Sequence, residues 1–345
     1  MSLKYTHLLQ YVASTPWAML QSKIDDMLSV LAFRAAGHTF TAEEIRARLG
    51  ESTAASSQTN GAIAVVPVRG MITHRMGGME ESSGGMSAER VTAMVRRAAA
   101  DASVSAIVLD VDSPGGTVPG VLEAADAVYE ARASKRIVAV CNATCASAAY
   151  WIASQAHEVV AIPSALDACI GSIGVFCVHQ DVSAALKNEG IEMTLIRAGK
   201  EKAAINPWTP LTDEQRAEMQ AGVDAAYAQF VRAVARGRGV STADVRRGYG
   251  EGRALSATDA KAAGLVDRIA TFDDVLLKLA GRSSKSGMRA SIDEATCPTC
   301  QWSGPLAELD GQEACCPRCG CAVLATATGI GARAAADRTR LMRLL

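Results

Sequence analysis

IVAVCNATCASAAYW, residues 137–151, joins an apolar run to a segment of small residues that ends in two aromatic residues. The run at 137–141 has the length and the β-branched character of a buried strand. Small residues after such a strand are typical of a helix that begins close against a sheet. Ser147 lies at this strand-to-helix transition, so it is either a packing residue at the start of a helix or a nucleophile presented there.

Strand-like and helix-like segments alternate on both sides of this stretch. Strands are predicted at 62–68, 106–111, 137–141 and 159–162, helices at 87–100, 118–133 and 147–156, and further apolar runs lie at 173–178 and 193–196. Near-continuous Val/Ile runs separated by helices indicate a parallel sheet covered on both faces. The predicted fold class is therefore α/β.

The flanking segments are predicted to be helical. Ile24, Met27, Leu28 and Leu31 follow helical spacing near the N-terminus, and Thr212 with Gln215 forms a capping box that opens a long helix to about residue 236. Three later residues are candidate helix caps: Ser241, Ser256 and Thr271. We predict a helical arm with a linker at 1–58, an α/β domain at 59–281, a linker at 282–294, a cysteine-rich module at 295–324 and an Arg-rich tail at 325–345.

The composition argues against two classes of function. The net charge of −1 provides no basic surface for nucleic acid or for an anionic membrane. No apolar run approaches the roughly 18 residues needed to span a bilayer, and residues 1–4 do not begin a signal peptide. We expect a soluble, cytoplasmic protein without a membrane span.

The cysteines point to a structural metal site. Six of the ten lie between Cys297 and Cys321. Two Cys-x2-Cys pairs at zinc-ribbon distance, CPTC and CPRC, give four expected zinc ligands: Cys297, Cys300, Cys316 and Cys319. Cys315 and Cys321 flank the second pair, so either is an alternative ligand, and a redox-active dithiol is the competing interpretation. Four thiolates leave no open position, so the zinc would be structural.

A glycine-rich loop, DVDSPGGT at 110–117, follows an apolar strand and precedes a helix. Glycines there allow the backbone to approach a ligand and leave N–H groups free for an anion. The competing interpretations are a simple strand-to-helix turn and a phosphate loop, but the phosphate-loop spacing is absent. Because it precedes Ser147 by about thirty residues, the loop is a candidate oxyanion hole.

Four motifs in order resemble one family. They are DSPGG at 112–116, CASAAY at 145–150, IGSIGV at 170–175 and AGKEK at 198–202. This order resembles the signal peptide peptidase A family of serine peptidases, family S49, and most of all its bacteriophage branch of prohead or head-maturation proteases. The resemblance covers about residues 60–280. It implies a ClpP/crotonase-like fold with a Ser-Lys dyad.

The family motifs imply a role for each matching residue. Ser147 would be the nucleophile, Lys202 the general base and Ser172 the hydroxyl that orients the lysine. Lys200 falls on a position that varies in the family. A lysine is a base only when it is neutral, which requires burial to depress its pKa. The competing interpretation of Lys202 is a solvated member of the charged run at 200–202.

The resemblance also implies an oxyanion hole and a substrate pocket. The backbone N–H groups of Gly116 and Ala148 would bind the oxyanion, and Gly115 would shape the loop. The family often has Gly-Gly where this chain has Ala148-Ala149, and the added methyl groups would narrow the space beside Ser147 and bear on substrate preference more than on activity. Apolar residues near both motifs would line a pocket for a small or apolar side chain, or else pack in the core: Val118, Val121, Leu122, Ile173, Val175 and Phe176.

Histidine is the commoner partner of a catalytic serine. The chain has five, and none lies in a catalytic motif: His7, His38, His74, His157 and His179. Gly-x-Ser-x-Gly is also missing, so an α/β-hydrolase is excluded. His157 and His179 are expected to be structural.

The resulting hypothesis is a Ser-Lys endopeptidase of phage capsid assembly. It would cut scaffold, portal or head proteins, or itself, in the host cytoplasm or inside a procapsid, without a catalytic cofactor. A ring-like homo-oligomer is expected because family members form such assemblies. The alternatives are a housekeeping protease like the signal peptide peptidases and a non-catalytic assembly protein. Enoyl-CoA hydratase chemistry would need a CoA site and acidic residues that the motifs do not provide.

Overall fold

The computed structural model describes residues 15–35, 58–60, 63–76, 85–166 and 169–281, together with two short strands farther on. The chain divides into two compact units, Met1–Ala280 and Gly281–Leu345. In the second unit, β13 (Ala295–Thr296) pairs antiparallel with β14 (Ser303–Gly304). The four expected zinc ligands, the linker at 282–294 and the tail at 325–345 lie outside the described residues.

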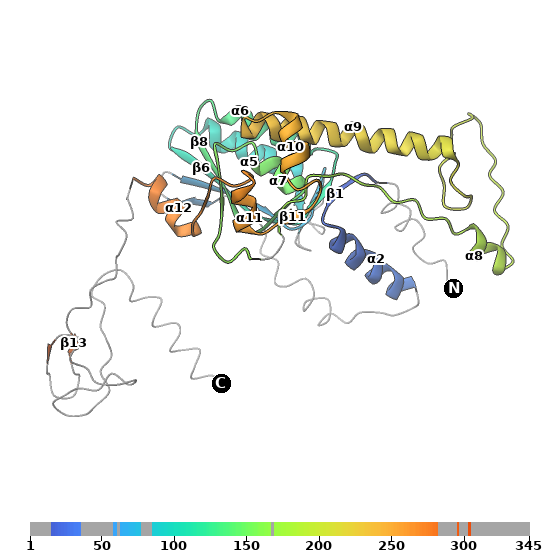
Figure 1. Cartoon of the computed structure of the whole chain (residues 1–345), viewed down its shortest axis with the longest axis horizontal. Helices are drawn as coiled ribbons and strands as arrows, with labels where there is room; N and C mark the ends of the chain where they lie inside the picture. The colour runs from blue at the N-terminus through green and yellow to red at the C-terminus, as the bar shows by residue number, and fades with distance from the viewer. Residues whose placement is uncertain are drawn as a thin grey trace. The chain divides into compact units, whose positions relative to one another are not determined.

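A parallel sheet forms the centre of the first unit (Figure 1). Its long strands are β3 (Ile63–Arg69), β6 (Ala106–Ser113), β8 (Arg136–Ala146) and β9 (Glu158–Ala161). β8 is central because it pairs with β6 on one side and with β9 on the other. Three short strands extend the sheet: β2 (Gln58–Asn60) pairs antiparallel with β3, β10 (Ile170–Gly171) pairs parallel with the end of β8, and β11 (Ala254–Leu255) pairs antiparallel with β10. β12 (Arg268–Ile269) lies beside β9.

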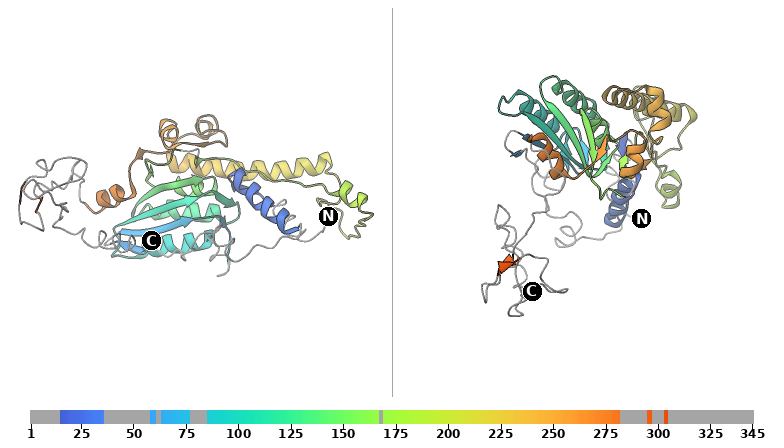
Figure 2. Two further views of the ribbon diagram at one scale, coloured as in Figure 1. Left: turned by 90° about the horizontal axis from the view of Figure 1, so that it is seen from below. Right: turned by 60° about the vertical axis from the view of Figure 1, so that its left-hand side comes forward.

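Alternate residues of each strand enter two different cores, as the period of two requires. Ile107, Leu109 and Val111 of β6 belong to the larger core, and Val108 belongs to the smaller one. Three helices cover the larger core: α5 (Ala88–Ala100), α6 (Val121–Ala131) and α7 (Ala148–Ala153). The opposite face is covered by α12 (Phe272–Leu279), and Figure 2 shows the sheet between these layers. The α/β class and the parallel sheet flanked by helices are confirmed.

A second, smaller sheet has the order β1-β7-β4-β5. Its strands are β1 (Trp17–Met19), β7 (Gly115–Thr117), β4 (Ile72–Thr73) and β5 (Met86–Ser87). β7 carries the two glycines of the predicted oxyanion loop between β1 and β4. Helix α2 (Gln21–Ala35) follows β1, and its Ile24 packs in a small apolar cluster with Trp17 and Met19.

The remaining helices of the first unit are α8 (Ser183–Asn188), α9 (Asp213–Arg238), α10 (Thr242–Gly248) and α11 (Ala257–Ala262). The buried residues of α9 all lie between Phe230 and Ala235, so only its C-terminal part packs on the sheet domain. There the Phe230 ring stacks on Trp151 of α7, with ring centroids 4.5 Å apart. The rest of α9 extends away from the sheet with α8 beyond its far end, a segment that we call the projecting hairpin (residues 183–229) (Figure 1).

Most predicted elements are confirmed. The predicted cap residues Thr212, Ser241, Ser256 and Thr271 all begin helices. The apolar runs at 173–178 and 193–196 are not strands, apart from one isolated bridge at Phe176. Along the part of the chain that the structure describes, no helix is both long enough and apolar enough to cross a membrane.

Candidate active site

Ser147 lies where β8 ends and α7 begins, in a strained backbone conformation. Its φ is 54° and its ψ is −117°, a combination that a non-glycine residue rarely adopts. The Ser147 N–H donates to Gly171 O at 2.7 Å, and its hydroxyl reaches Gly174 O at 3.4 Å. The residue is fully buried. Ser147 therefore occupies a sharp strand-to-helix turn, the kind of position at which some hydrolases hold a nucleophilic serine.

A bulge in β8 determines this position. The pairing of β6 with β8 shifts between Val111 and Ser113, so β8 gains residues relative to β6. Ala143 inside the bulge has a φ of 90°, and the Thr144 N–H donates to Asp112 Oδ1 at 3.2 Å. The Asp112 carboxylate therefore satisfies a backbone donor that the bulge removes from the ladder. Sequence reasoning quoted Asp112 only as part of a motif and missed this role.

The loop that ends in β7 is packed so closely by its neighbours that neither of its glycines has room for a side chain. A Cβ on Gly116 would stand 1.7 Å from Ile72 O, and a Cβ on Gly115 would stand 3.1 Å from Ala148 N. Gly115 also has a φ of 100°. Gly115 thus lies against Ala146 and Ala148, the two neighbours of Ser147, and Gly116 follows it in β7.

Ser172 reaches the same region through β10. It follows Gly171, which accepts the Ser147 N–H, and its own φ is 49°. The Ser172 N–H donates to Arg253 O at 3.0 Å and its hydroxyl donates to Gly252 O at 3.1 Å. The turn before β11 therefore fixes Ser172 beside the nucleophile.

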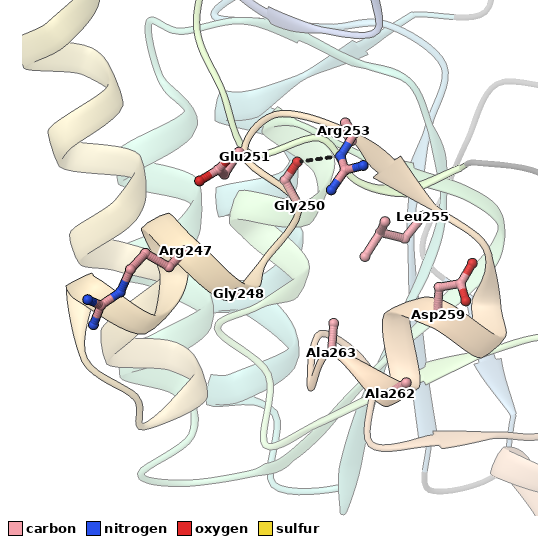
Figure 3. A pocket seen from close by; sticks show the side chains of 9 residues that line it. All are labelled: Arg247, Gly248, Gly250, Glu251, Arg253, Leu255, Asp259, Ala262 and Ala263. Carbon is pink, nitrogen blue, oxygen red and sulfur yellow. Dashed lines mark hydrogen bonds between the residues drawn. The ribbon is translucent and has the colours of Figure 1, made fainter.

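That turn also lines a pocket of about 340 Å³ (Figure 3). Arg253 Nε donates to Gly250 O across its wall at 3.2 Å. The lining combines charges of both signs with small residues: Arg247, Gly248, Gly250, Glu251, Arg253, Leu255, Asp259, Ala262 and Ala263. Neither Ser147 nor Lys202 is among the residues that line it.

Lys202 is not brought to Ser147 within this chain. Its side chain is exposed, and the residue lies between α8 and α9 in the sequence, within the projecting hairpin. Gln215 Nε2 in the first turn of α9 donates to Ala204 O at 3.0 Å, which holds this segment near the start of that helix. Fifteen helical residues separate Gln215 from Phe230, a length of about 22 Å. The structure thus brings together Ser147, Ser172 and the loop that contains Gly115, and leaves Lys202 outside this group.

Other groups with suitable chemistry are engaged elsewhere. His157 Nδ1 accepts the Ile137 N–H at 3.1 Å, near the start of β8, about 30 Å along the strand from Ser147. Burial, with Arg132 and Arg136 nearby, lowers the pKa of His157. His179 Nε2 lies 2.9 Å from Asn206 O. Burial raises the pKa of Cys145, so its thiol stays protonated and is a poor nucleophile.

A metal site is not found in the described ranges. Among residues 15–35, 58–60, 63–76, 85–166 and 169–281, no cluster of His, Cys, Asp and Glu is arranged to hold an ion. The predicted zinc ligands lie outside these ranges, so the zinc module stays a prediction.

The sequence is similar to a peptidase family and to proteins of two bacteriophages. Residues 130–285 match the model of Peptidase family S49. The head-tail preconnector protein GP5 of Enterobacteria phage P21 is 35% identical over 218 residues, which cover 63% of this chain and 42% of that protein. The capsid assembly protease C of Escherichia phage lambda is 33% identical over 256 residues, which cover 72% of this chain and 57% of that protein.

A cellular relative shares a similar region. Protease 4 of Salmonella typhi is 34% identical over 226 residues, which cover 65% of this chain and 35% of that protein. The chain therefore spans only about a third to somewhat more than half of the length of these relatives.

Proposed function

We propose that this chain, whose residues 130–285 match the model of peptidase family S49, is a serine peptidase of that family with Ser147 as nucleophile and Lys202 as general base. One observation carries the proposal. Ser147 stands in a strained turn against the Gly115-Gly116 loop, with Ser172 fixed beside it. This is the arrangement in which an acyl-transfer nucleophile and backbone oxyanion donors meet.

The chemistry follows from these positions. Ser147 Oγ attacks the peptide carbonyl carbon while neutral Lys202 accepts the hydroxyl proton. The N–H groups of Gly116 and Ala148 stabilise the oxyanion, and the lysine returns the proton to the leaving amine. Water then attacks the acyl carbonyl carbon while Lys202 accepts a proton from the water. The acid product leaves as Ser147 Oγ takes this proton from the lysine. Lys202 must be buried in the working enzyme, because an exposed lysine stays protonated at neutral pH.

We propose that a second copy of the chain brings Lys202 to Ser147. The projecting hairpin holds Lys202 about 20 Å or more from the packed end of α9, which argues against contact within one chain. A hairpin of this kind reaches a neighbouring subunit instead. A base that functions only after assembly would also restrict cleavage to the assembled protein.

Exposed apolar residues on the same hairpin support this assembly. Ile191, Met193 and Leu195 alternate along an extended segment, and Ile196 is 92% exposed. Such a row on a surface is characteristic of a protein–protein contact. We therefore propose a homo-oligomer in which this row is covered by a second copy.

The proposed substrates are proteins of a phage head. Two relatives bear the names capsid assembly protease and head-tail preconnector protein, which favours scaffold, portal or head proteins as substrates and the host cytoplasm or the procapsid as the location. The second candidate is a protease of signal-peptide-peptidase type, because a putative signal peptide peptidase of Enterococcus faecium is 31% identical over 180 residues. Comparing how fast the purified chain cleaves head proteins and how fast it cleaves signal-peptide remnants would distinguish the two candidates.

The C-terminal module is proposed to be a zinc ribbon. The spacing of Cys297, Cys300, Cys316 and Cys319 supports a closed tetrathiolate site, which would give a short segment a stable fold without a core of its own. The proposed role is binding a protein partner of the peptidase, with no part in the chemistry.

The dyad is tested by single substitutions. Ser147→Ala and Lys202→Ala should each reduce cleavage of casein or head proteins by about 10⁴-fold, because either change removes the activated nucleophile. Lys200→Ala, two residues away, is the matched control and should retain activity. Full activity in Lys202→Ala would show that another group is the base.

The shared site is tested by mixing the two inactive variants. In co-assembled oligomers of Ser147→Ala and Lys202→Ala chains, about a quarter of the sites would combine an intact serine with an intact lysine. Recovery of roughly that fraction of activity is expected. A mixed oligomer without activity would place both residues of the dyad in one chain.

A further inference from the structure

A segment of the chain itself crosses the candidate active site. Residues 16–20, which contain β1, run antiparallel to the oxyanion loop. The Val118 N–H donates to Pro16 O at 3.2 Å, and the Leu20 N–H donates to Pro114 O at 3.0 Å. The loop residues 114–118 therefore provide one complete edge for this strand.

The other edge of the strand is paired as well. The Trp17 N–H donates to Phe176 O at 2.8 Å, and the Phe176 N–H donates to Trp17 O at 3.0 Å. Phe176 follows the Ser172 segment, so residues 16–20 lie between the two segments that flank Ser147. Alternate residues bond to alternate edges, which is how an extended peptide binds in a groove with two open strand edges.

The carbonyl of Ala18 lies at the oxyanion loop. A Cβ on Gly115 would stand 2.2 Å from Ala18 O and 3.1 Å from Ala148 N, so this carbonyl and the predicted oxyanion donor approach the same point. Ser147 is fully buried in the same structure, and a peptidase nucleophile in that state is closed to substrate.

The side chains of the strand divide between two environments. Ala18 faces the main core, which includes Val121 and Ile173 of the predicted substrate pocket. Trp17 and Met19 pack in the small cluster under α2. A strand in this position thus presents a small side chain to the enzyme body and large ones to the other side.

We propose that residues 16–20 are an intramolecular ligand of the peptide-binding groove and must leave it before a substrate reaches Ser147. The inference rests on the proposed peptidase function and assigns the groove: substrate binds as a strand antiparallel to residues 114–118, with a small side chain at the place of Ala18. Substrate and β1 compete for the same two edges.

The test measures binding without catalysis. The probe is a fluorescein-labelled peptide with the sequence of residues 14–21, STPWAMLQ, titrated by anisotropy into full-length Ser147→Ala and into Ser147→Ala/Trp17→Ala. Removing the buried Trp17 anchor should release β1, and the probe, which carries its own tryptophan, should bind the double variant about tenfold more tightly or better. Ser147→Ala/Val30→Ala is the control, because Val30 lies on α2 with 41% of its surface exposed.

A second variant tests the same competition in the opposite direction, by locking β1 in place. Trp17 and Thr117 are directly opposite and form a non-hydrogen-bonded pair, the closer type, so Trp17→Cys/Thr117→Cys in the Ser147→Ala background should form a disulfide on oxidation. The locked chain should exclude the probe, and dithiothreitol should restore binding.

The outcomes separate this inference from the proposed function. The inference is overturned if Ser147→Ala and Ser147→Ala/Trp17→Ala bind the probe equally. It is also overturned if the oxidised and reduced forms of the double-cysteine variant bind the probe equally, because β1 would then be a permanent strand of the sheet. With Ser147 intact, Trp17→Ala should also cleave short peptides faster. If the released variant binds the probe and Trp17→Ala with Ser147 intact cleaves nothing, the catalytic proposal fails and the groove assignment stands.

Discussion

Two adjacent glycines, Gly115 and Gly116, determine how closely the backbone of β7 approaches its neighbours. Gly115 needs its positive φ, and Gly116 has no room for a side chain because Ile72 O occupies the position of a Cβ. Both constraints come from backbone atoms of neighbouring strands, which do not yield as a flexible side chain does. The loop is therefore a rigid part of the site.

Gly116→Ala is expected to reduce peptidase activity by about 100-fold, because the β7 backbone must move away from β4 and carry the oxyanion donor with it. Steady-state cleavage of a peptide substrate measures this. Gly222→Ala, within α9 where a Cβ meets nothing within 4 Å, is the control and should raise stability by about 0.5–1 kcal/mol without loss of activity. Wild-type activity in Gly116→Ala would exclude the loop from the oxyanion hole.

A buried carboxylate connects the elements at the other end of the sheet. Glu158 of β9 bonds to Arg268 of β12, to Arg136 of β8 at 3.0 Å and lies 3.6 Å from Lys278 of α12. Burial acts to raise the pKa of Glu158, but the bond and charge of Arg268, with the other two cations, outweigh it and hold this pKa below the usual range. The network therefore joins α12 to the sheet.

Glu158→Gln is expected to lower the free energy of unfolding by about 1–3 kcal/mol at pH 7. Because the folded pKa lies below the ordinary value of 4.5, the contribution of Glu158 is complete above that value and is lost as the pH falls through the folded pKa. As the pH is lowered, the free energy of unfolding should thus fall less steeply for the variant than for the wild type. Urea unfolding at several pH values measures this.

The control for this network is Glu89→Gln, which breaks an exposed pair with Arg75 and should change stability little. If the free energy of unfolding of Glu158→Gln falls in acid as steeply as that of the wild type, the network is not a source of pH-dependent stability.

At the scale of the whole molecule, the chain separates a peptidase-like unit from a C-terminal unit. The division falls between Ala280 and Gly281. The chemistry proposed for the first unit needs no metal, and the cysteine spacing predicts one in the second. The two functions should therefore be separable by substitution.

Purified full-length chain is expected to hold about one zinc ion, because two Cys-x2-Cys pairs complete one tetrahedral site. Cys297→Ser/Cys300→Ser should lose the metal and retain peptidase activity, measured by elemental analysis and by cleavage of one substrate. Cys177→Ser, a half-buried cysteine of the first unit, should retain both. Zinc-free wild-type protein would contradict the ribbon.

Local patterns in the sequence determined much of the fold. The alternating apolar runs predicted the strands of the parallel sheet, and the caps at Thr212, Ser241, Ser256 and Thr271 predicted where helices begin, because both signals act between residues close in the chain. Two of the ordered motifs, DSPGG and IGSIGV, contain residues that lie near Ser147, whereas AGKEK does not.

Contacts between distant residues were decided only by the tertiary structure. The pairing of Trp17–Met19 with Gly115–Thr117 joins segments about a hundred residues apart, and no local pattern encodes it. The separation of Lys202 from Ser147 depends on where α9 leaves the sheet, because burial begins only at Phe230. Burial and strand pairing are collective properties of the folded chain, so a motif identifies the chemical groups and the packing decides which of them meet.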